Sequence, residues 1–162
     1  MNPTIYSLAE CLGIGLQSRQ ITVTTAESCT GGGVAQAITA VAGSSAWFEG
    51  AFVTYSNRLK NQWLGVTNEL LDRCGAVSEQ VALAMLRGAL RESGAGIGVA
   101  ISGIAGPDGG SDAKPVGTVC FAWGSGAKPA HTTCHFSGDR AAIREQAVAF
   151  ALEILLEYLD KN

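Results

Sequence analysis

The sequence predicts one α/β domain in which helices cover both faces of a mixed β-sheet. Helical and strand-like segments follow one another in the approximate order α-β-α-β-α-α-β-β-β-α, which is typical of a three-layer α/β/α fold. Residues 97–102 are almost continuously apolar, as expected for a strand with helices on both sides. Two further strand-like segments, 116–123 and 131–136, are joined through glycines at 124 and 126. Because a hairpin pairs antiparallel strands, we expect a mixed sheet.

The first half of the chain is expected to alternate helices and strands. Asn2 and Pro3 are typical of the N-cap and the first position of a helix, and apolar residues at helical spacing follow them. Strands are predicted at 21–25 and 48–55, with a short helix of small residues at 33–41 between them.

The second half contains two more strongly patterned helices. A helical turn is predicted at 58–64, and Ser78 is a typical cap for the next helix, whose apolar residues recur every three or four positions. The last helix is expected to start after 138–139 and to bury an apolar stripe. No repeat or linker-like segment interrupts this pattern, so residues 1–162 are predicted to form a single domain.

Composition and charge disfavour several classes of function. Hydrophobic residues make up 47% of the chain and charged residues 15%, which favours a compact core over disordered tails. The net charge of −3 and the lack of a basic run disfavour a nucleic-acid partner. No apolar segment reaches the roughly 18 residues of a membrane span, and no secretory signal pattern is present. The five scattered cysteines, odd in number, favour a reduced, cytoplasmic protein.

Two glycine-rich segments, 25–33 and 101–110, are the main candidates for a binding site. Each follows a strand-like run and combines hydroxyls, small residues and glycine, as ligand loops do at the carboxyl ends of strands. The first runs into a predicted helix, whose free amides suit an anion or a reaction oxyanion. The candidate binding residues in these segments are Glu27, Thr30, Gly31, Gly32, Ser102, Gly103, Ala105 and Gly106. Glu27 has the alternative role of holding nearby backbone or forming a salt bridge.

The familiar catalytic motifs are absent. The sequence has no P-loop, no G-x-S-x-G nucleophile elbow and no H-E-x-x-H segment. The only histidines, His131 and His135, would lie about 13 Å apart on a strand, too far to share a metal ion. Neither is close to a glycine-rich turn, so a base other than histidine is expected.

Lys60 is the candidate base. It follows Tyr55 and Asn57 at the point where a strand leads into a helix, and helical spacing places Asn57 on the same side. A lysine that is partly buried in a pocket loses proton affinity and can act as a base, and serine–lysine pairs are a known alternative to serine–histidine. The alternative is a surface lysine at a helix end.

Three residues are candidate nucleophiles. Ser28 is expected where a strand ends and a helix begins, a position that also suits an ordinary N-cap. Cys29 is a weaker candidate, because no histidine is placed to activate it. Ser45 belongs to a second serine pair at an element junction, whose alternative role is a helix end and turn.

Arg140 and the segment 107–112 complete the candidate site. Arginine at the start of the last helix suits a phosphate, although a solvated pair with Asp139 or Glu145 is an alternative. The polar segment 107–112 is either a lid over the pocket or simply a long loop.

Nearly the whole chain, from about residue 23 to the final helix, resembles one known family. The motifs that carry the resemblance are TAESCTGG (25–32), GSSAWF (43–48), VTYSN (53–57) with Lys60, GAVS (75–78), ISGIAGPDGG (101–110), KPVGTV (114–119) and FSGDR (136–140). They are similar to the CinA C-terminal domain family, whose stand-alone members are nicotinamide-nucleotide amidohydrolases. The N-terminal molybdopterin-binding-like domain of longer CinA proteins has no counterpart here, so functions of that domain are not implied.

The resemblance implies hydrolysis of nicotinamide mononucleotide to nicotinic acid mononucleotide and ammonia, in pyridine nucleotide recycling. It implies a nucleotide as the small-molecule partner and no metal or cofactor. Tyr55 and Lys60 match the family's catalytic segment, and Ser28 and Ser45 both match family serines; we favour Ser28 as nucleophile. Arg140 would neutralise the 5′-phosphate. The competing interpretation is a non-catalytic nucleotide-binding or regulatory module, and the apolar composition is compatible with a homodimer.

Overall fold

The computed structural model describes residues 1–162. The helices are α1 (Pro3–Arg19), α2 (Gly33–Thr39), α3 (Asn57–Leu64), α4 (Asn68–Cys74), α5 (Glu79–Ser93) and α6 (Arg140–Lys161), with a short 3₁₀ segment, η1 (Ser44–Ala46). The strands are β1 (Val23–Glu27), β2 (Phe48–Val53), β3 (Ile97–Gly103), β4 (Thr118–Gly124) and β5 (Pro129–His135). None of the helices combines the length and the apolar composition that a membrane crossing requires.

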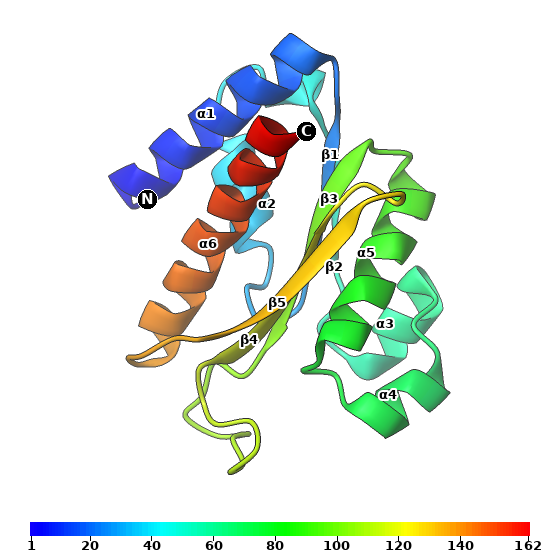
Figure 1. The fold of residues 1–162 in the computed structure, drawn as a ribbon. Helices are drawn as coiled ribbons and strands as arrows, with labels where there is room; N and C mark the ends of the chain where they lie inside the picture. The colour runs from blue at the N-terminus through cyan, green and yellow to red at the C-terminus, as the bar shows by residue number, and fades with distance from the viewer.

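The five strands form one mixed sheet in the order β2-β1-β3-β4-β5. Helices α1, α2 and α6 cover one face of this sheet, and α3, α4 and α5 lie on the other (Figure 1). Strand β1 is parallel to β2 and β3, whereas β4 is antiparallel to β3 and to β5. The predicted three-layer α/β/α fold with a mixed sheet and a terminal hairpin is confirmed.

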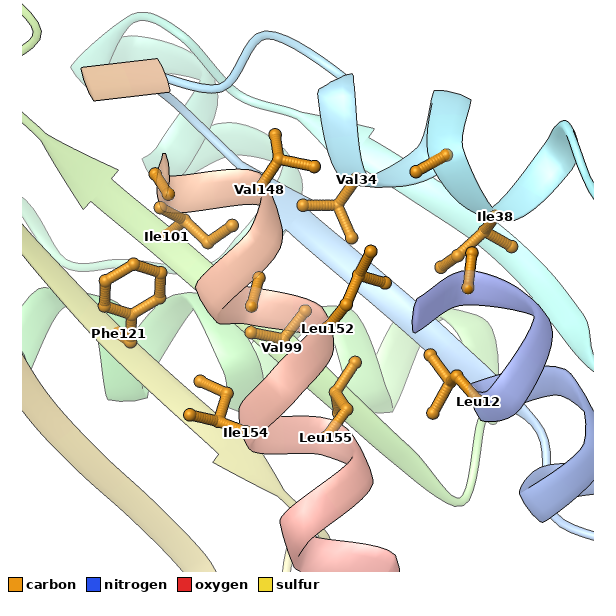
Figure 2. Packing of buried hydrophobic residues seen from close by; sticks show 14 of the residues in the cluster. Leu12, Val34, Ile38, Val99, Ile101, Phe121, Val148, Leu152, Ile154 and Leu155 are labelled. Atoms are coloured by element: carbon orange, nitrogen blue, oxygen red, sulfur yellow. The ribbon is translucent and has the colours of Figure 1, made fainter. Parts of the chain in front are cut away.

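The larger hydrophobic core lies between the sheet and α1, α2 and α6. Figure 2 shows Leu152 and Leu155 of α6 among Val99 of β3, Ile38 of α2 and Leu12 of α1, all of which are buried. Full burial of each such side chain contributes roughly 1.5–3 kcal/mol. This core therefore fixes α6 against the sheet, and with it the residues at the start of α6.

Capping residues mark where three of the helices begin, as predicted. Asn2 accepts a hydrogen bond from the Thr4 amide, and Ser78 accepts one from the Val81 amide. Asp139 caps α6 in the same way. Because these side chains satisfy amides that have no partner inside the helix, they set the first residue of each helix.

Strand β1 starts at Val23, two residues later than predicted. Gln20 ends α1 in the left-handed conformation at φ 54°, and the Ile21 amide donates to Leu16 O at 3.1 Å. Ile21 therefore belongs to the C-terminal cap of α1, and the chain becomes extended only after it.

Helix α4 was not predicted. It has seven residues and buries only Leu71, so its sequence carries no readable periodicity; Thr67 caps it. Strand β4 starts at Thr118 rather than at 116, because the chain turns at Gly117 with φ 96°. The other predicted boundaries differ from the observed ones by two residues or fewer.

The parallel arrangement of β1, β2 and β3 brings the loops after these strands together at their carboxyl ends. Glu27, at the end of β1, lies opposite Val53 in β2 and Ile101 in β3. Because parallel strands end at the same edge, the segments that follow these three residues meet there.

Candidate active site

Ser28 and Lys60 form the centre of the candidate site. Ser28 follows β1 directly, and its amide donates to Ile101 O at 3.0 Å, which fixes it beside β3. Lys60 lies in the first turn of α3, which Ser56 caps through the Leu59 amide. The Nζ atom of Lys60 is 3.1 Å from Ser28 Oγ. The strand-to-helix junction after β2 thus brings a lysine to the serine that follows β1.

The Lys60 amine is buried and has no carboxylate partner. Only 1% of its side chain is exposed, and its other two partners are the carbonyl oxygens of Thr54 at 2.9 Å and Tyr55 at 3.0 Å. Burial lowers the pKa of this amine below its usual 10.5, because desolvation disfavours the charged form.

The three partners of Lys60 suit a neutral amine. A neutral amine has two N–H groups and one lone pair. The two carbonyl oxygens can only accept, so in the neutral form they take both hydrogens of Lys60 and the lone pair faces the hydroxyl of Ser28, whereas in the charged form Lys60 donates to all three partners. This arrangement can remove the proton of the serine hydroxyl and make the oxygen nucleophilic.

A cavity of about 260 Å³ opens beside this pair. Nine of the predicted site residues line it: Ser28, Tyr55, Asn57, Lys60, Ser102, Gly103, Ala105, Gly106 and Arg140. They come from the loops after β1 and β2, from the first turn of α3, from the end of β3 and the loop after it, and from the start of α6. Cys29, Ala76, Val77, Ile104, Asp108 and Gly109 complete the lining.

Backbone amides that lack an acceptor in the protein lie along this cavity. The N–H groups of Cys29, Ala105 and Gly106 donate to no protein atom. Gly106 has φ +79°, and a Cβ there would lie 2.5 Å from a side-chain carbon of Val116. Glycine is therefore required for this turn, and its free amide is suited to a developing oxyanion.

Arg140 bridges two sides of the cavity. Its guanidinium donates to Gly106 O at 2.7 Å and to the Tyr55 hydroxyl at 3.3 Å. Asp139 caps α6 rather than pairing with this arginine. An arginine uses at most five donors, so Arg140 retains donors for an anionic ligand.

The amides at the start of α2 are not free, which contradicts the sequence-based expectation. Glu27 is fully buried, and its carboxylate accepts from the amides of Val34 and Ala35, both at 3.0 Å, and from the Thr30 hydroxyl at 2.7 Å. Thr30, Gly31 and Gly32 do not line the cavity; both glycines have positive φ and make the turn into α2. Glu27 thus holds the backbone, the alternative role considered for it.

The structure does not bring Ser45 to the cavity. Ser45 is exposed in η1, just before β2 begins. Ser28 lies just after β1 ends, and β1 and β2 are parallel. The two serines therefore lie at opposite ends of the parallel strands, and Ser45 has no contact with Lys60.

Cys29 lines the cavity but is a poor nucleophile. Desolvation by burial raises the pKa of its thiol to about 11. At neutral pH the thiol therefore stays protonated, and the thiolate is the reactive form.

Sequence reasoning missed Arg144. Its Nε atom donates to Cys29 O at 3.1 Å and Nη2 donates to Thr30 O at 3.2 Å, so α6 supports the loop that carries Ser28. The signal was available: Arg144 follows Arg140 by four residues, which places both on one face of a helix.

The largest cavity lies elsewhere, between α5, β4 and β5. It encloses about 690 Å³ and contains both histidines of the chain. Glu79 bonds to His131 and, at 2.6 Å, to the Thr133 hydroxyl, while His135 contacts the Thr118 hydroxyl at 3.4 Å. No three His, Cys, Asp or Glu side chains are grouped as metal ligands. Glu79 and His131 are therefore paired with each other, and Lys114 donates to Cys74 O at 2.8 Å.

Comparison with known proteins gives close relatives over the full length. Nicotinamide-nucleotide amidohydrolase PncC of Pseudomonas putida is 56% identical over 157 residues, which cover 97% of this chain and 98% of the relative. The protein of the same name from Escherichia coli K12 is 54% identical over 159 residues, covering 98% and 96%. The solved structure of competence/damage inducible protein CihA from Agrobacterium tumefaciens matches with a TM-score of 0.95 at 43% identity, covering 99% of this chain and 98% of that one.

The family model described as CinA C-terminal domain matches residues 5–159. Because this match covers nearly the whole fold described above, the resemblance seen in the sequence motifs is confirmed. The chain belongs to the CinA C-terminal domain family.

Proposed function

We propose that this chain is a nicotinamide-nucleotide amidohydrolase that converts nicotinamide mononucleotide to nicotinic acid mononucleotide and ammonia, in pyridine nucleotide recycling. Full-length relatives at 50–56% identity carry this activity in their names. The structural observation that carries the proposal is the contact of 3.1 Å between Ser28 Oγ and a buried lysine amine.

Ser28 is the nucleophile and Lys60 the general base in this mechanism. Ser28 Oγ attacks the carboxamide carbon while its proton passes to Lys60 Nζ, giving a tetrahedral intermediate. The C–N bond then breaks, and the leaving nitrogen takes the proton from Lys60 and departs as ammonia. A nicotinoyl ester of Ser28 remains.

Water completes the cycle. Lys60 removes a proton from water, which attacks the ester carbon. When the ester C–O bond breaks, Ser28 Oγ recovers the proton from Lys60 and the acid product leaves. A positioned general base of this kind contributes roughly 10²–10⁴-fold to the rate.

The free amides along the cavity stabilise the oxyanion of each tetrahedral intermediate. The amides of Cys29, Ala105 and Gly106 have no protein acceptor to give up when the oxyanion forms. Preorganised donors of this kind each contribute about 2.7–4 kcal/mol to transition-state stabilisation.

Arg140 binds the 5′-phosphate with the donors that Gly106 and Tyr55 leave free. Loss of a charge-assisted pair should cost about 2–4 kcal/mol of binding. Nicotinamide riboside, which has no phosphate, is therefore expected to be a much poorer substrate. Equal efficiency on both compounds would rule out the phosphate contact.

The decisive test is ammonia release by the purified chain from nicotinamide mononucleotide, beside nicotinamide and nicotinamide riboside. Rapid, phosphate-dependent release supports the enzyme. Tight nucleotide binding with no release would instead favour the second candidate, a non-catalytic nucleotide-binding or regulatory module; some relatives are named competence/damage inducible proteins.

We further propose that residues 1–162 act as one amidohydrolase domain in the cytoplasm and as a homodimer. All five cysteines are free thiols, which suits a reducing compartment. Val53, Tyr55 and Trp63 are exposed around the end of edge strand β2, and such apolar surface favours association. Light scattering coupled to gel filtration tests the dimer, and fractionation of cells tests the location.

A further inference from the structure

The catalytic cavity has one carboxylate in its lining, that of Asp108. The other charged side chains there are Lys60 and Arg140. Glu27 lies behind the cavity, fully buried and saturated by its own hydrogen bonds, so it is not available to a ligand. Any negative charge that the cavity offers to a bound molecule comes from Asp108.

Asp108 has no partner in the protein. Its carboxylate makes no ion pair and no hydrogen bond with another side chain or with the backbone, and the residue is exposed. Its neighbours Gly106 and Gly109 have positive φ, +79° and +92°, and hold the turn that presents it. Because the fold does not use this carboxylate, it is free to accept from a ligand.

The proposed substrate carries a positive charge that has no partner among Ser28, Lys60 and Arg140. Nicotinamide mononucleotide has a carboxamide, which meets Ser28 and Lys60, and a phosphate, for which Arg140 is the candidate. Between these groups lies a pyridinium ring with a full positive charge. Neither of the cavity's two cationic side chains can bind that charge.

We propose that Asp108 is the specificity-determining residue that selects the cationic pyridinium ring. This inference rests on the proposed deamidation of nicotinamide mononucleotide. The aromatic ring of Tyr55 lines the same cavity with 62% of the residue exposed, and a cation over an aromatic face is also favoured. The site therefore distinguishes the oxidised nucleotide from its dihydro form, which has the same ribose, phosphate and carboxamide but an uncharged ring.

The test compares Asp108→Asn with a matched control on the same loop. Asp112 is exposed, has no ion pair, and does not line the cavity, so Asp112→Asn removes the same charge from the same segment. Two quantities are measured for each variant: KM for nicotinamide mononucleotide, and the inhibition constant of the dihydro nucleotide as a competitor.

We expect Asp108→Asn to raise KM for nicotinamide mononucleotide by about three- to fivefold, the size of one solvated charge contact. The inhibition constant of the dihydro form should stay within about twofold of the wild type. Asp112→Asn should change neither quantity, and Asp108→Glu should recover most of the lost affinity.

Equal weakening of both nucleotides would overturn the inference, because the carboxylate would then contact the ribose hydroxyls that both share. An unchanged KM in Asp108→Asn would overturn it as well. Failure of the proposed function looks different: the wild-type protein itself would release no ammonia from nicotinamide mononucleotide.

Discussion

Replacing Glu27 with glutamine should destabilise the fold by weakening its hydrogen bonds rather than by changing its packing, since the two side chains have nearly the same shape. Oε1 of Glu27 accepts from the Thr30 hydroxyl and the Val34 amide, and Oε2 accepts from the Thr25 hydroxyl and the Ala35 amide. The side chain is fully buried. The substitution therefore tests how much these four bonds contribute to holding the loop after β1.

The magnitude follows from which donors glutamine can satisfy. Its amide oxygen can replace Oε1 and keep the bonds from Thr30 and Val34, which are buried. Its NH₂ group then replaces Oε2. The Thr25 hydroxyl can rotate to accept from this NH₂, but the Ala35 amide faces another donor. One unsatisfied amide and the loss of charge from the remaining bonds should together cost about 2–4 kcal/mol.

Urea unfolding, followed by tryptophan fluorescence and circular dichroism, measures this cost, and thermal unfolding measures the matching change in Tm. For a chain of this length each 1 kcal/mol lowers Tm by about 2–4 °C, so a drop of roughly 5–15 °C is expected. Glu49→Gln is the matched control, because Glu49 is exposed on β2 with no hydrogen bond or ion pair. The reasoning is refuted if Glu27→Gln lies within about 1 kcal/mol of the wild type, or if the control costs as much.

Three further predictions concern the rate, the oxyanion turn and the acid stability. Lys60→Met and Ser28→Ala should each lower the rate of ammonia release at least about 10²-fold, and the double variant should lower it hardly more, because the two residues act as a unit. The wild-type rate should rise with pH through the lowered pKa of Lys60. Additive losses in the double variant would show that the two residues act separately. Gly106→Ala should slow ammonia release, because a Cβ would lie 2.5 Å from a valine carbon, whereas Gly126→Ala meets nothing within 4 Å and should be neutral. Hydrogen bonds from Thr133 and then His131 lower the pKa of Glu79 from 4.5, so its contribution to stability is present above pH 4.5 and is lost as the pH falls through the lowered pKa. The difference in unfolding free energy between the wild type and Glu79→Gln, measured by urea unfolding, should therefore shrink in acid. A difference that grows in acid would contradict this.

The layer order and the location of the site at one sheet edge were predictable from the sequence. The apolar run at 97–102 and the glycine-rich turns follow simple local rules, and the structure has a strand and two loops there. Ser28 and Lys60 are each predicted at a point where a strand leads into a helix, and no histidine is placed to act as the base. That the two residues meet follows from the parallel pairing of β1 and β2, which the structure shows and the sequence pattern did not establish.

The role of Glu27 and the position of Ser45 were not predictable in the same way. Whether the amides of α2 are free depends on the rotamer of a side chain that precedes them by seven residues. Ser45 and Ser28 both lie where one helix or strand gives way to the next, and only the directions of β1 and β2 show that these two positions are at opposite ends of the strands. Arg144 acts across 115 positions of sequence on the Cys29 carbonyl, a contact that depends on how α6 packs against α2.

The buried carboxylate of Glu27 changes what the glycine-rich turn can do for a ligand. In a phosphate-binding loop at a helix N-terminus the ligand supplies the anion that the free amides bind. Here the protein supplies that anion itself, and Arg144 holds the outer carbonyls of the same turn. Contacts within the protein therefore fix the position of Ser28, the proposed nucleophile, without help from a ligand. Ligand binding should therefore add little order to this segment, and in the proposed mechanism the phosphate is bound by the Arg140 side chain rather than by the main-chain amides of α2.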